Sequence, residues 1–267
     1  MIRVLFIGDV MGSPGRRAIV NLLGALRSDL DIHFAVVNGE NAAGGLGITP
    51  SAAREIFDAG ADVITLGNHA FTQRKVHDYL NDEPRIIRPA NFPPGAPGRG
   101  WGVYKASTGQ SVGVVNLIGR VFMQAVDCPF RAADAVLDDF HDQPDVVVVD
   151  MHAEATSEKI AMCWHLNGRA AAVIGTHTHV QTSDERVTQD GTACITDAGM
   201  TGVHDSVLGL DKDSVLNRFT TQMHTKFQLA RGEALLQGVV VDCDPASGRA
   251  SAIRRISVSE SDEAPLE

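Results

Sequence analysis

Short runs of β-branched and other apolar residues alternate with segments of helical periodicity through the first two thirds of the chain. Residues 2–8 (IRVLFIG), 34–39 (FAVVNG) and 62–67 (DVITLG) are typical of buried strands. Helices are predicted between them, over residues 16–30 and from Thr49-Pro50 onward. Strands that alternate with helices usually pair in parallel and are covered by those helices. The order therefore predicts an α/β protein.

The later strands follow one another more directly. Residues 102–106 and 111–119 are predicted to pair around a turn at Thr108-Gly109, and residues 235–244 and 251–258 around a turn at 245–248. Hairpins pair antiparallel, so we expect two packed mixed β-sheets flanked by helices, an α/β/β/α sandwich. We expect one domain over residues 1–258 and a polar, acidic tail over 259–267.

Charge and composition limit the partners. The 267 residues include 23 Lys and Arg against 33 Asp and Glu, for a formal net charge of −10. Because no long basic run is present, tracking along a nucleic-acid backbone is not expected, whereas a metal-rich pocket could still hold a small anion. The apolar start of the chain is interrupted by Asp9 and a Gly/Pro segment well short of the roughly 20 residues of a membrane span. We therefore expect a first strand there, with no signal peptide and no membrane contact.

The four cysteines give no sign of a framework. They lie far apart, with no CxxC pair, at Cys128, Cys163, Cys194 and Cys243. This spacing predicts reduced thiols in a cytoplasmic protein and no zinc site on sulfur.

Polar residues recur just beyond the C-terminal ends of the apolar runs. Five such positions carry Asp9, Glu40-Asn41, Asn68-His69, His152 and His177-Thr178-His179. Strand C-termini share one edge of an open α/β sheet, and ligands bind at that edge. Each position alone also has a structural interpretation, such as a turn, a helix cap or a hydrogen-bonded core pair, but together those interpretations require five coincidences.

A mixed set of imidazole, carboxylate and amide groups favours first-row transition metals over calcium or a thiolate site. The candidate ligands are too many for one tetrahedral centre. Two metal ions that share a bridging carboxylate would account for them.

The order of these blocks resembles the five-block signature of the calcineurin-like metallophosphoesterases, with Gly67-Asn68-His69 and the segment 175–179 (GTHTH) its most specific parts. The chain departs from the usual pattern at two places. Asp9-Val10-Met11 stands where Asp-x-His is usual, and Gly39-Glu40-Asn41 stands where GDxxD is usual. Since a thioether is a poor ligand for a hard dinuclear centre, Asn41 would take the place of the missing histidine.

The same departures, with the block at residues 196–202 (TDAGMTG), resemble the YmdB-like branch of bacterial phosphodiesterases. That resemblance implies hydrolysis of 2′,3′-cyclic nucleotides by an enzyme with two metal ions, iron being favoured and manganese the alternative. RNA ends are a further candidate substrate, and a homo-oligomer is left open.

The resemblance also implies a role for each residue. Around the first metal it places Asp9, Glu40, Asn41 and His179, with Glu40 bridging, and around the second Asn68, His152 and His177. A metal-bridging hydroxide would attack phosphorus while His69 protonates the leaving oxygen. A purely structural role is the alternative for His69.

Three further expectations concern the surroundings of these residues. Asp150 could orient His152, because residues two apart on a strand share a face. The segment 199–202 would either hold phosphate or base, or shape the pocket, and His204 is the other histidine that could line it.

Other functions remain open from the sequence. A phosphomonoesterase would use the same chemistry, and a regulatory nucleotide-binding protein could keep the metal site with incidental turnover. A metal-dependent amidohydrolase or peptidase is disfavoured, because no HExxH segment is present.

Overall fold

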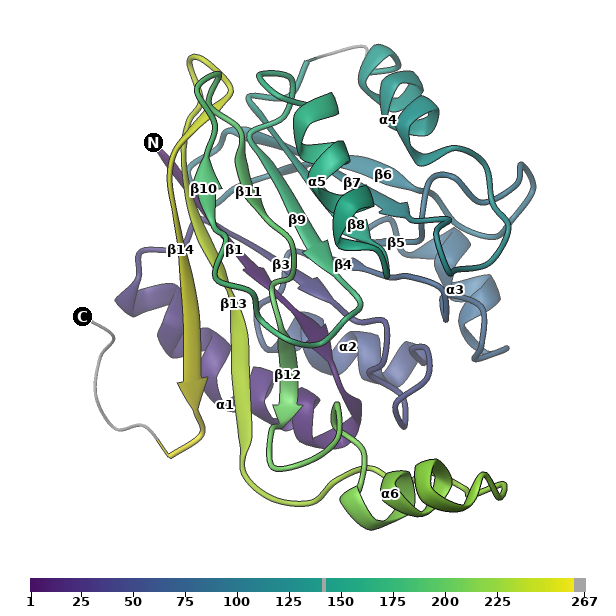
Figure 1. Ribbon diagram of the computed structural model, residues 1–267. Helices are drawn as coiled ribbons and strands as arrows, with labels where there is room; N and C mark the ends of the chain where they lie inside the picture. Colours follow the sequence, from purple (N-terminus) through teal and green to yellow (C-terminus); the bar gives the residue numbers. More distant parts are fainter. Residues whose placement is uncertain (141–142, 262–267) are drawn as a thin grey trace.

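The computed structural model describes residues 1–140 and 143–261, and it places two β-sheets face to face between layers of helices (Figure 1). The helices are α1 (Gly12–Asp29), α2 (Pro50–Asp58), α3 (Val76–Asp82), α4 (Pro129–Asp138), α5 (Thr156–His165) and α6 (Lys212–Thr221).

The first sheet has eight strands, in the order β2-β12-β13-β1-β3-β4-β5, with β14 paired to β13. Its strands are β1 (Ile2–Ile7), β2 (Asp9–Val10), β3 (Phe34–Asn38), β4 (Val63–Thr65), β5 (Ile86–Ile87), β12 (Met200–Val203), β13 (Ala234–Asp244) and β14 (Arg249–Ser259). Strands β1, β3, β4 and β5 run parallel, and β13 lies antiparallel to β1.

The second sheet has six strands, in the order β10-β11-β9-β8-β7-β6. They are β6 (Trp101–Lys105), β7 (Ser111–Ile118), β8 (Val146–His152), β9 (Ala172–Thr176), β10 (Arg186–Val187) and β11 (Ala193–Ile195). The four central strands are parallel, and β6 and β10 close the edges antiparallel. Both sheets are mixed and flanked by helices, so the predicted fold class is confirmed.

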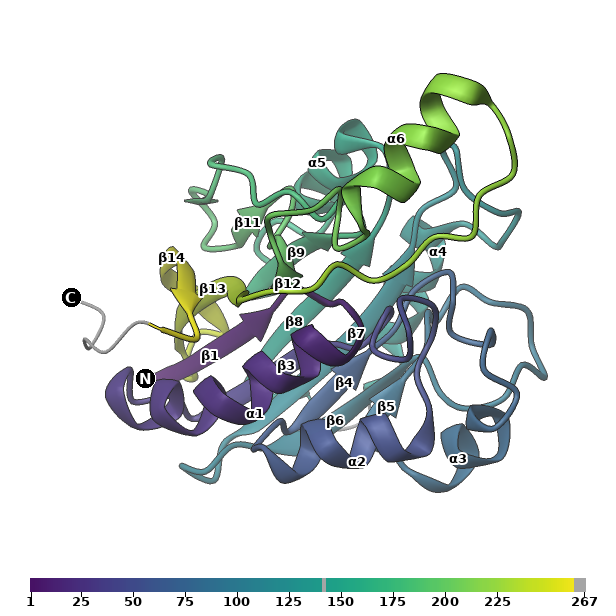
Figure 2. The same ribbon diagram turned by 90° about the horizontal axis from the view of Figure 1, so that it is seen from below.

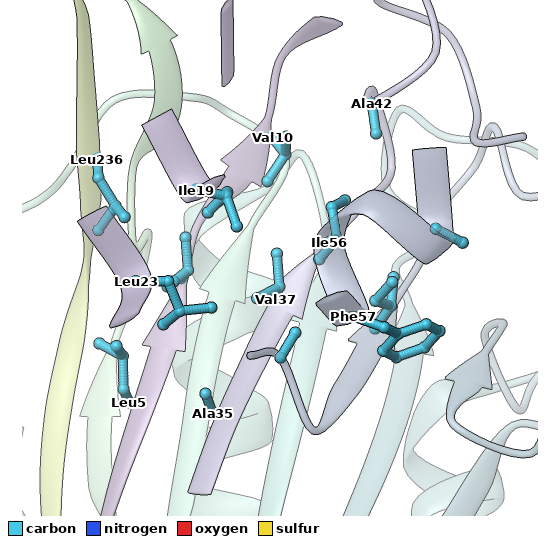
Figure 3. Close-up of a cluster of buried hydrophobic side chains, with 14 of the residues drawn as sticks. Leu5, Val10, Ile19, Leu23, Ala35, Val37, Ala42, Ile56, Phe57 and Leu236 are labelled. Atoms are coloured by element: carbon cyan, nitrogen blue, oxygen red, sulfur yellow. The ribbon is translucent and has the colours of Figure 1, made fainter. Parts of the chain in front are cut away.

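Alternate residues of the strands point to opposite layers, as the period of two requires. In β1, Leu5 and Ile7 join the cluster under α1 and α2 (Figure 3), whereas Val4 and Phe6 join the cluster between the sheets. Strand β8 divides its valines in the same way, between the inter-sheet layer and a third cluster beneath α4 and α5. The turned view shows the resulting order of layers, with α1 and α2 on one side of the sheets and α5 on the other (Figure 2).

Local signals are confirmed at several points. The Thr49 hydroxyl caps α2 by accepting a hydrogen bond from the Ala52 backbone N–H, with Pro50 in the first turn. The predicted hairpin of β6 and β7 forms in antiparallel register, as does that of β13 and β14. No pattern predicted α6, which projects away from the sheets (Figure 1).

The expectation that all four cysteines are reduced thiols is wrong. Cys163 of α5 and Cys194 of β11 form a disulfide, with their Cα atoms 6.2 Å apart, while Cys128 and Cys243 are free. The two half-cystines are 31 residues apart in sequence and meet because both belong to the core beneath α5. Packing between distant segments brought them together, and spacing along the chain carries no sign of it.

The first two residues of the predicted tail, Ser259 and Glu260, belong to the described part of the fold. Ser259 is the last residue of β14, and the Glu260 carboxylate pairs with Arg17 of α1 at 2.8 Å. The rest of that predicted tail, residues 262–267, lies outside the described residues. Within the described part of the chain, none of the helices is both long and apolar enough to cross a bilayer.

Candidate metal centre

The predicted ligands meet where the C-terminal ends of the parallel strands of one sheet face those of the other. Asp9 begins β2, Glu40 follows β3, and Asn68 follows β4, all in the first sheet. His152 ends β8 and His177 follows β9, in the second sheet. The site is therefore assembled from the two sheets jointly.

Glu40 lies at the centre of the first half. Its carboxylate accepts hydrogen bonds from the backbone N–H groups of Gly67 and His69, so the loop after β4 wraps around it. The His69 Nδ1 lies 3.1 Å from Glu40 Oε1 and 3.0 Å from Asn41 Oδ1. The hydrogen bond to Glu40 raises the pKa of His69, whereas burial raises the pKa of Glu40 itself. Two separate segments of the sequence, residues 40–41 and 67–69, are thus in direct contact.

His152 joins the second half to the first. Its Nε2 lies 3.1 Å from both Asn68 Oδ1 and His177 Nδ1, and 3.7 Å from Glu40 Oε1. A Cβ atom at Gly67 would lie 2.2 Å from the His152 ring, so only glycine fits between Asn68 and the strand before it. The conformation of this loop and the position of the ring are fixed together.

Asp9 and His179 complete the cluster. The Asp9 Oδ2 accepts a hydrogen bond of 3.0 Å from the His177 backbone N–H. The other oxygen, Oδ1, is 3.7 Å from His179 Nε2 and 3.9 Å from His152 Nδ1. The Asn41 amide Nδ2 lies 3.1 Å from His179 Nε2. The structure therefore brings all seven predicted ligands and His69 into one connected set of contacts.

The chemistry of this set fits cations. Among the described residues, Asp9 Oδ1 is a buried oxygen with no hydrogen-bond partner. Burial lowers the pKa values of His152 and His179, which keeps both imidazoles neutral and able to coordinate. Burial also raises the pKa of Asp9 well above its usual value. As arranged here, no three His, Cys, Asp or Glu side chains of the described residues form a group that could by itself hold a metal ion. The side chains instead hydrogen-bond to one another, and the ligand roles stay a prediction.

A buried polar network between the sheets supports the cluster. The Asp150 carboxylate accepts hydrogen bonds from Asn38 Nδ2 at 2.9 Å, from Thr65 Oγ1 and from Thr176 Oγ1 at 2.7 Å. Thr176 Oγ1 also lies 2.9 Å from His152 Nδ1. Asp150 thus reaches His152 through Thr176, where direct orientation was the expectation. With the Thr176 hydroxyl donating to Asp150, His152 donates from Nδ1 and leaves Nε2 free as an acceptor.

Sequence reasoning missed Asn38 and Thr65. Each ends an apolar strand, and a buried polar residue in that place is the signal that could have pointed to them. It also missed Lys159 and Asp197, which lie against the turn that carries His177 and His179.

A cavity of about 470 Å³ opens beside the cluster. Polar groups of the cluster and the apolar side chains of Leu46, Leu208, Phe227 and Leu229 line it together. The Glu154 carboxylate also lines the cavity, 3.1 Å from His177 Nε2. A mixed cavity of this kind can hold a molecule that is anionic at one end and flat and apolar at the other.

The segment 199–202 supports the cluster from behind. Its strand β12 pairs in parallel with β2, and the Asp9 N–H donates to the Gly199 carbonyl at 3.0 Å. His204 lines a neighbouring hollow of about 430 Å³ together with Met200, and His179 borders both hollows. The pairing of β12 with β2 positions Asp9, and this role was not among those expected for the segment 199–202.

Comparisons with known proteins identify relatives of the whole chain. The family described as "YmdB-like protein" matches residues 5–256. The chain is 45% identical over 258 residues to a 2′,3′-cyclic-nucleotide 2′-phosphodiesterase of Bacillus subtilis, covering 97% of each chain.

Solved structures give the same grouping. A hypothetical protein from Thermus thermophilus shares 41% sequence identity with a TM-score of 0.91, over 97% of this chain and 99% of that one. The calcineurin-like phosphoesterase YfkN from Bacillus subtilis, at 12% identity and a TM-score of 0.57 over 97% and 90% of the two chains, shares the fold. Matching motifs, fold and relatives along almost the full length agree, and the chain belongs to the YmdB-like family.

Proposed function

We propose that the protein is a metal-dependent phosphodiesterase that opens 2′,3′-cyclic nucleotides to phosphomonoesters. The observation that carries this proposal is the convergence of Asp9, Glu40 and His152 with the neighbouring amides and histidines beside one cavity. The activity named for the Bacillus subtilis relative supports the substrate class.

Two cations would be held by the side chains already described as the two halves of the cluster. Asp9, Asn41 and His179 would hold one, Asn68, His152 and His177 the other, and Glu40 would contact both. When bound, such ions neutralise charge on phosphoryl oxygens and lower the pKa of a water molecule. A donor set that mixes imidazole with carboxylate and amide oxygen suits first-row transition metals. Among these we propose iron, with manganese as the alternative, because the resemblance to the YmdB-like phosphodiesterases implies them.

His69 is the proposed proton donor. Its ring is partly exposed and lines the cavity, while Nδ1 is held by Asn41 and Glu40. The proton would therefore pass from Nε2 to the departing ribose oxygen, which is a poor leaving group without one. A histidine that is held at one nitrogen and whose ring lines the cavity has the geometry this role requires.

The apolar side chains of the cavity would take the nucleobase. Leu208 and Phe227 line the cavity, and each is about half exposed. A cyclic phosphate at the cluster would then direct its base across these side chains.

We propose that the reaction takes place in the cytoplasm.

The test compares substrates that differ in one feature. Protein loaded with manganese or iron is assayed on 2′,3′-cyclic AMP, 3′,5′-cyclic AMP, bis(p-nitrophenyl) phosphate and p-nitrophenyl phosphate. We expect kcat/KM for 2′,3′-cyclic AMP to exceed that for the monoester. A faster monoester reaction would identify a phosphomonoesterase, and tight cyclic-nucleotide binding without turnover would identify a regulatory protein.

A further inference from the structure

A buried ion pair lies just behind the turn that carries two of the proposed ligands. The Lys159 ammonium of α5 is 3.0 Å from Asp197 Oδ2, and the two side chains are 3% and 1% exposed. Burying two charges costs desolvation energy that their attraction does not always recover, so such a pair is weak evidence for stability alone. Its neighbours indicate what else it does.

Both members of the pair contact Thr178. The Asp197 Oδ2 accepts hydrogen bonds from the Thr178 backbone N–H at 3.0 Å and from its hydroxyl at 2.6 Å. The Lys159 Nζ lies 3.3 Å from the same hydroxyl. Asp197 Oδ1 accepts from the Gly199 N–H at 2.8 Å, which ties the pair to the segment that pairs with β2. Backbone and side chain of one residue are thus held by the same buried carboxylate.

Thr178 stands between His177 and His179, whose backbone conformations are unfavourable. Their φ angles are +97° and +64°, in the region that non-glycine residues rarely adopt. Such conformations persist only where surrounding contacts impose them. The imposed turn directs both rings toward the cluster, where His177 contacts His152 and His179 contacts Asn41.

The preceding strand is built to let the lysine approach. A Cβ atom at Gly175 would lie 2.8 Å from Lys159 Cδ and 1.9 Å from the Thr196 carbonyl oxygen. Glycine at this position therefore admits the lysine side chain beneath β9 and beside the segment that carries Asp197. The path of Lys159 to the turn depends on this missing side chain.

We propose that Lys159 and Asp197 are positioning residues that hold the His177-Thr178-His179 turn in its ligand-presenting conformation. The consequence for metal affinity rests on the proposed function, whereas the consequence for the turn itself does not. Neither residue is among the proposed ligands, and both act through Thr178. Changing residues that orient metal ligands typically weakens metal affinity about 10- to 100-fold.

The experiment compares Lys159→Met with Arg27→Met. Arg27 forms an ion pair with Asp62 at 2.6 Å at the C-terminal end of α1, away from the cluster, so it controls for loss of an ion pair as such. Two readouts are taken, hydrogen exchange of the amides at 176–180 in chelator-treated protein and the dissociation constant for Mn²⁺. We expect Lys159→Met to speed exchange of the Thr178 amide at least 10-fold and to weaken Mn²⁺ binding about 10-fold or more. Arg27→Met should leave both readouts unchanged.

The proposal is overturned if Lys159→Met folds and keeps both the exchange rate and the Mn²⁺ affinity, or if Arg27→Met changes them equally. If Lys159→Met does not fold, Thr178→Val decides, because it removes the hydroxyl and keeps the backbone contact and the side-chain shape. Faster exchange in that variant supports the proposal, and wild-type exchange refutes it. A wild-type protein that binds no Mn²⁺ would refute the metal centre, while the exchange measurement would still decide the role of the pair.

Discussion

Substituting Gly67 by alanine tests whether the position of His152 determines activity. A Cβ atom at residue 67 would lie 2.2 Å from His152 Cδ2 and 2.3 Å from Nε2, while ordinary contacts begin at 3.4 Å. The ring would have to retreat by 3.4 − 2.2 = 1.2 Å, or the loop that binds Glu40 would have to move by as much. Either movement displaces a proposed ligand.

The expected loss follows from that displacement. A misplacement of about 1 Å in a reacting constellation costs on the order of 100-fold in rate, which corresponds to about 2.7 kcal/mol of transition-state stabilisation. Forcing a methyl group into this packed site should also lower the free energy of unfolding by about 1–3 kcal/mol.

The assay is kcat/KM on 2′,3′-cyclic AMP, with metal content and melting temperature measured on the same preparations. Gly24→Ala is the matched control, because a Cβ atom there meets nothing within 4 Å and the residue lies within α1. Alanine in a helix interior is favoured over glycine by about 0.5–1 kcal/mol, so this variant should be fully active and slightly more stable. If Gly67→Ala kept kcat/KM within about threefold of the wild type, far short of the loss expected for a 1 Å displacement, the reasoning from His152 geometry would be refuted.

Four other changes have defined outcomes. His69→Ala should retain metal and lose about 10²–10⁴-fold in rate on 2′,3′-cyclic AMP but far less on bis(p-nitrophenyl) phosphate, whose leaving group needs no proton; equal losses on both would contradict the donor role. Glu40→Ala should lose both metal ions by elemental analysis, and one ion retained at full occupancy would exclude a bridging role. Burial raises the pKa of Asp150 from 3.8 to about 7 in the folded protein, so its stabilising contribution is complete below pH 3.8 and is lost as the pH rises toward 7. The free energy of unfolding of the chelator-treated wild type, measured with urea, should therefore fall across that window relative to that of Asp150→Asn. Parallel pH profiles of the two proteins would contradict this prediction. Reducing the Cys163–Cys194 disulfide, which closes a 31-residue separation, should lower the free energy of unfolding by about 3–4 kcal/mol, and an unchanged melting temperature under reductant would argue against the bond.

The residues at strand ends were the most predictable part of the site. Asp9, His152 and His177 each follow a run whose periodicity identifies it as a strand, and the shared edge of parallel strands then brings them together. The antiparallel β13 was also within reach, because its long apolar run is followed by a Pro/Gly turn. Periodicity and turn chemistry are local signals, and these features depend on little else.

Contacts between distant segments were beyond such reasoning. Asn38 meets Asp150 across 112 residues, and Lys159 meets Asp197 only because α5 packs over β9. The disulfide and the projecting α6 have the same origin in tertiary packing. The alignment of two packed sheets depends on the side chains that fill the space between them. The sequence of one strand alone does not show which residues of the other sheet it will contact.

The division of the cluster between two sheets makes its dimensions a property of the hydrophobic layer that separates them. Phe34 and Val148 lie in that layer, on strands that end at opposite halves of the cluster. A change of volume there would alter the gap across which Asp9 and His152 face each other, without touching either. Substitutions in this inter-sheet layer would therefore change the spacing of the proposed metal ligands at the sheet edge, far from the substituted side chain.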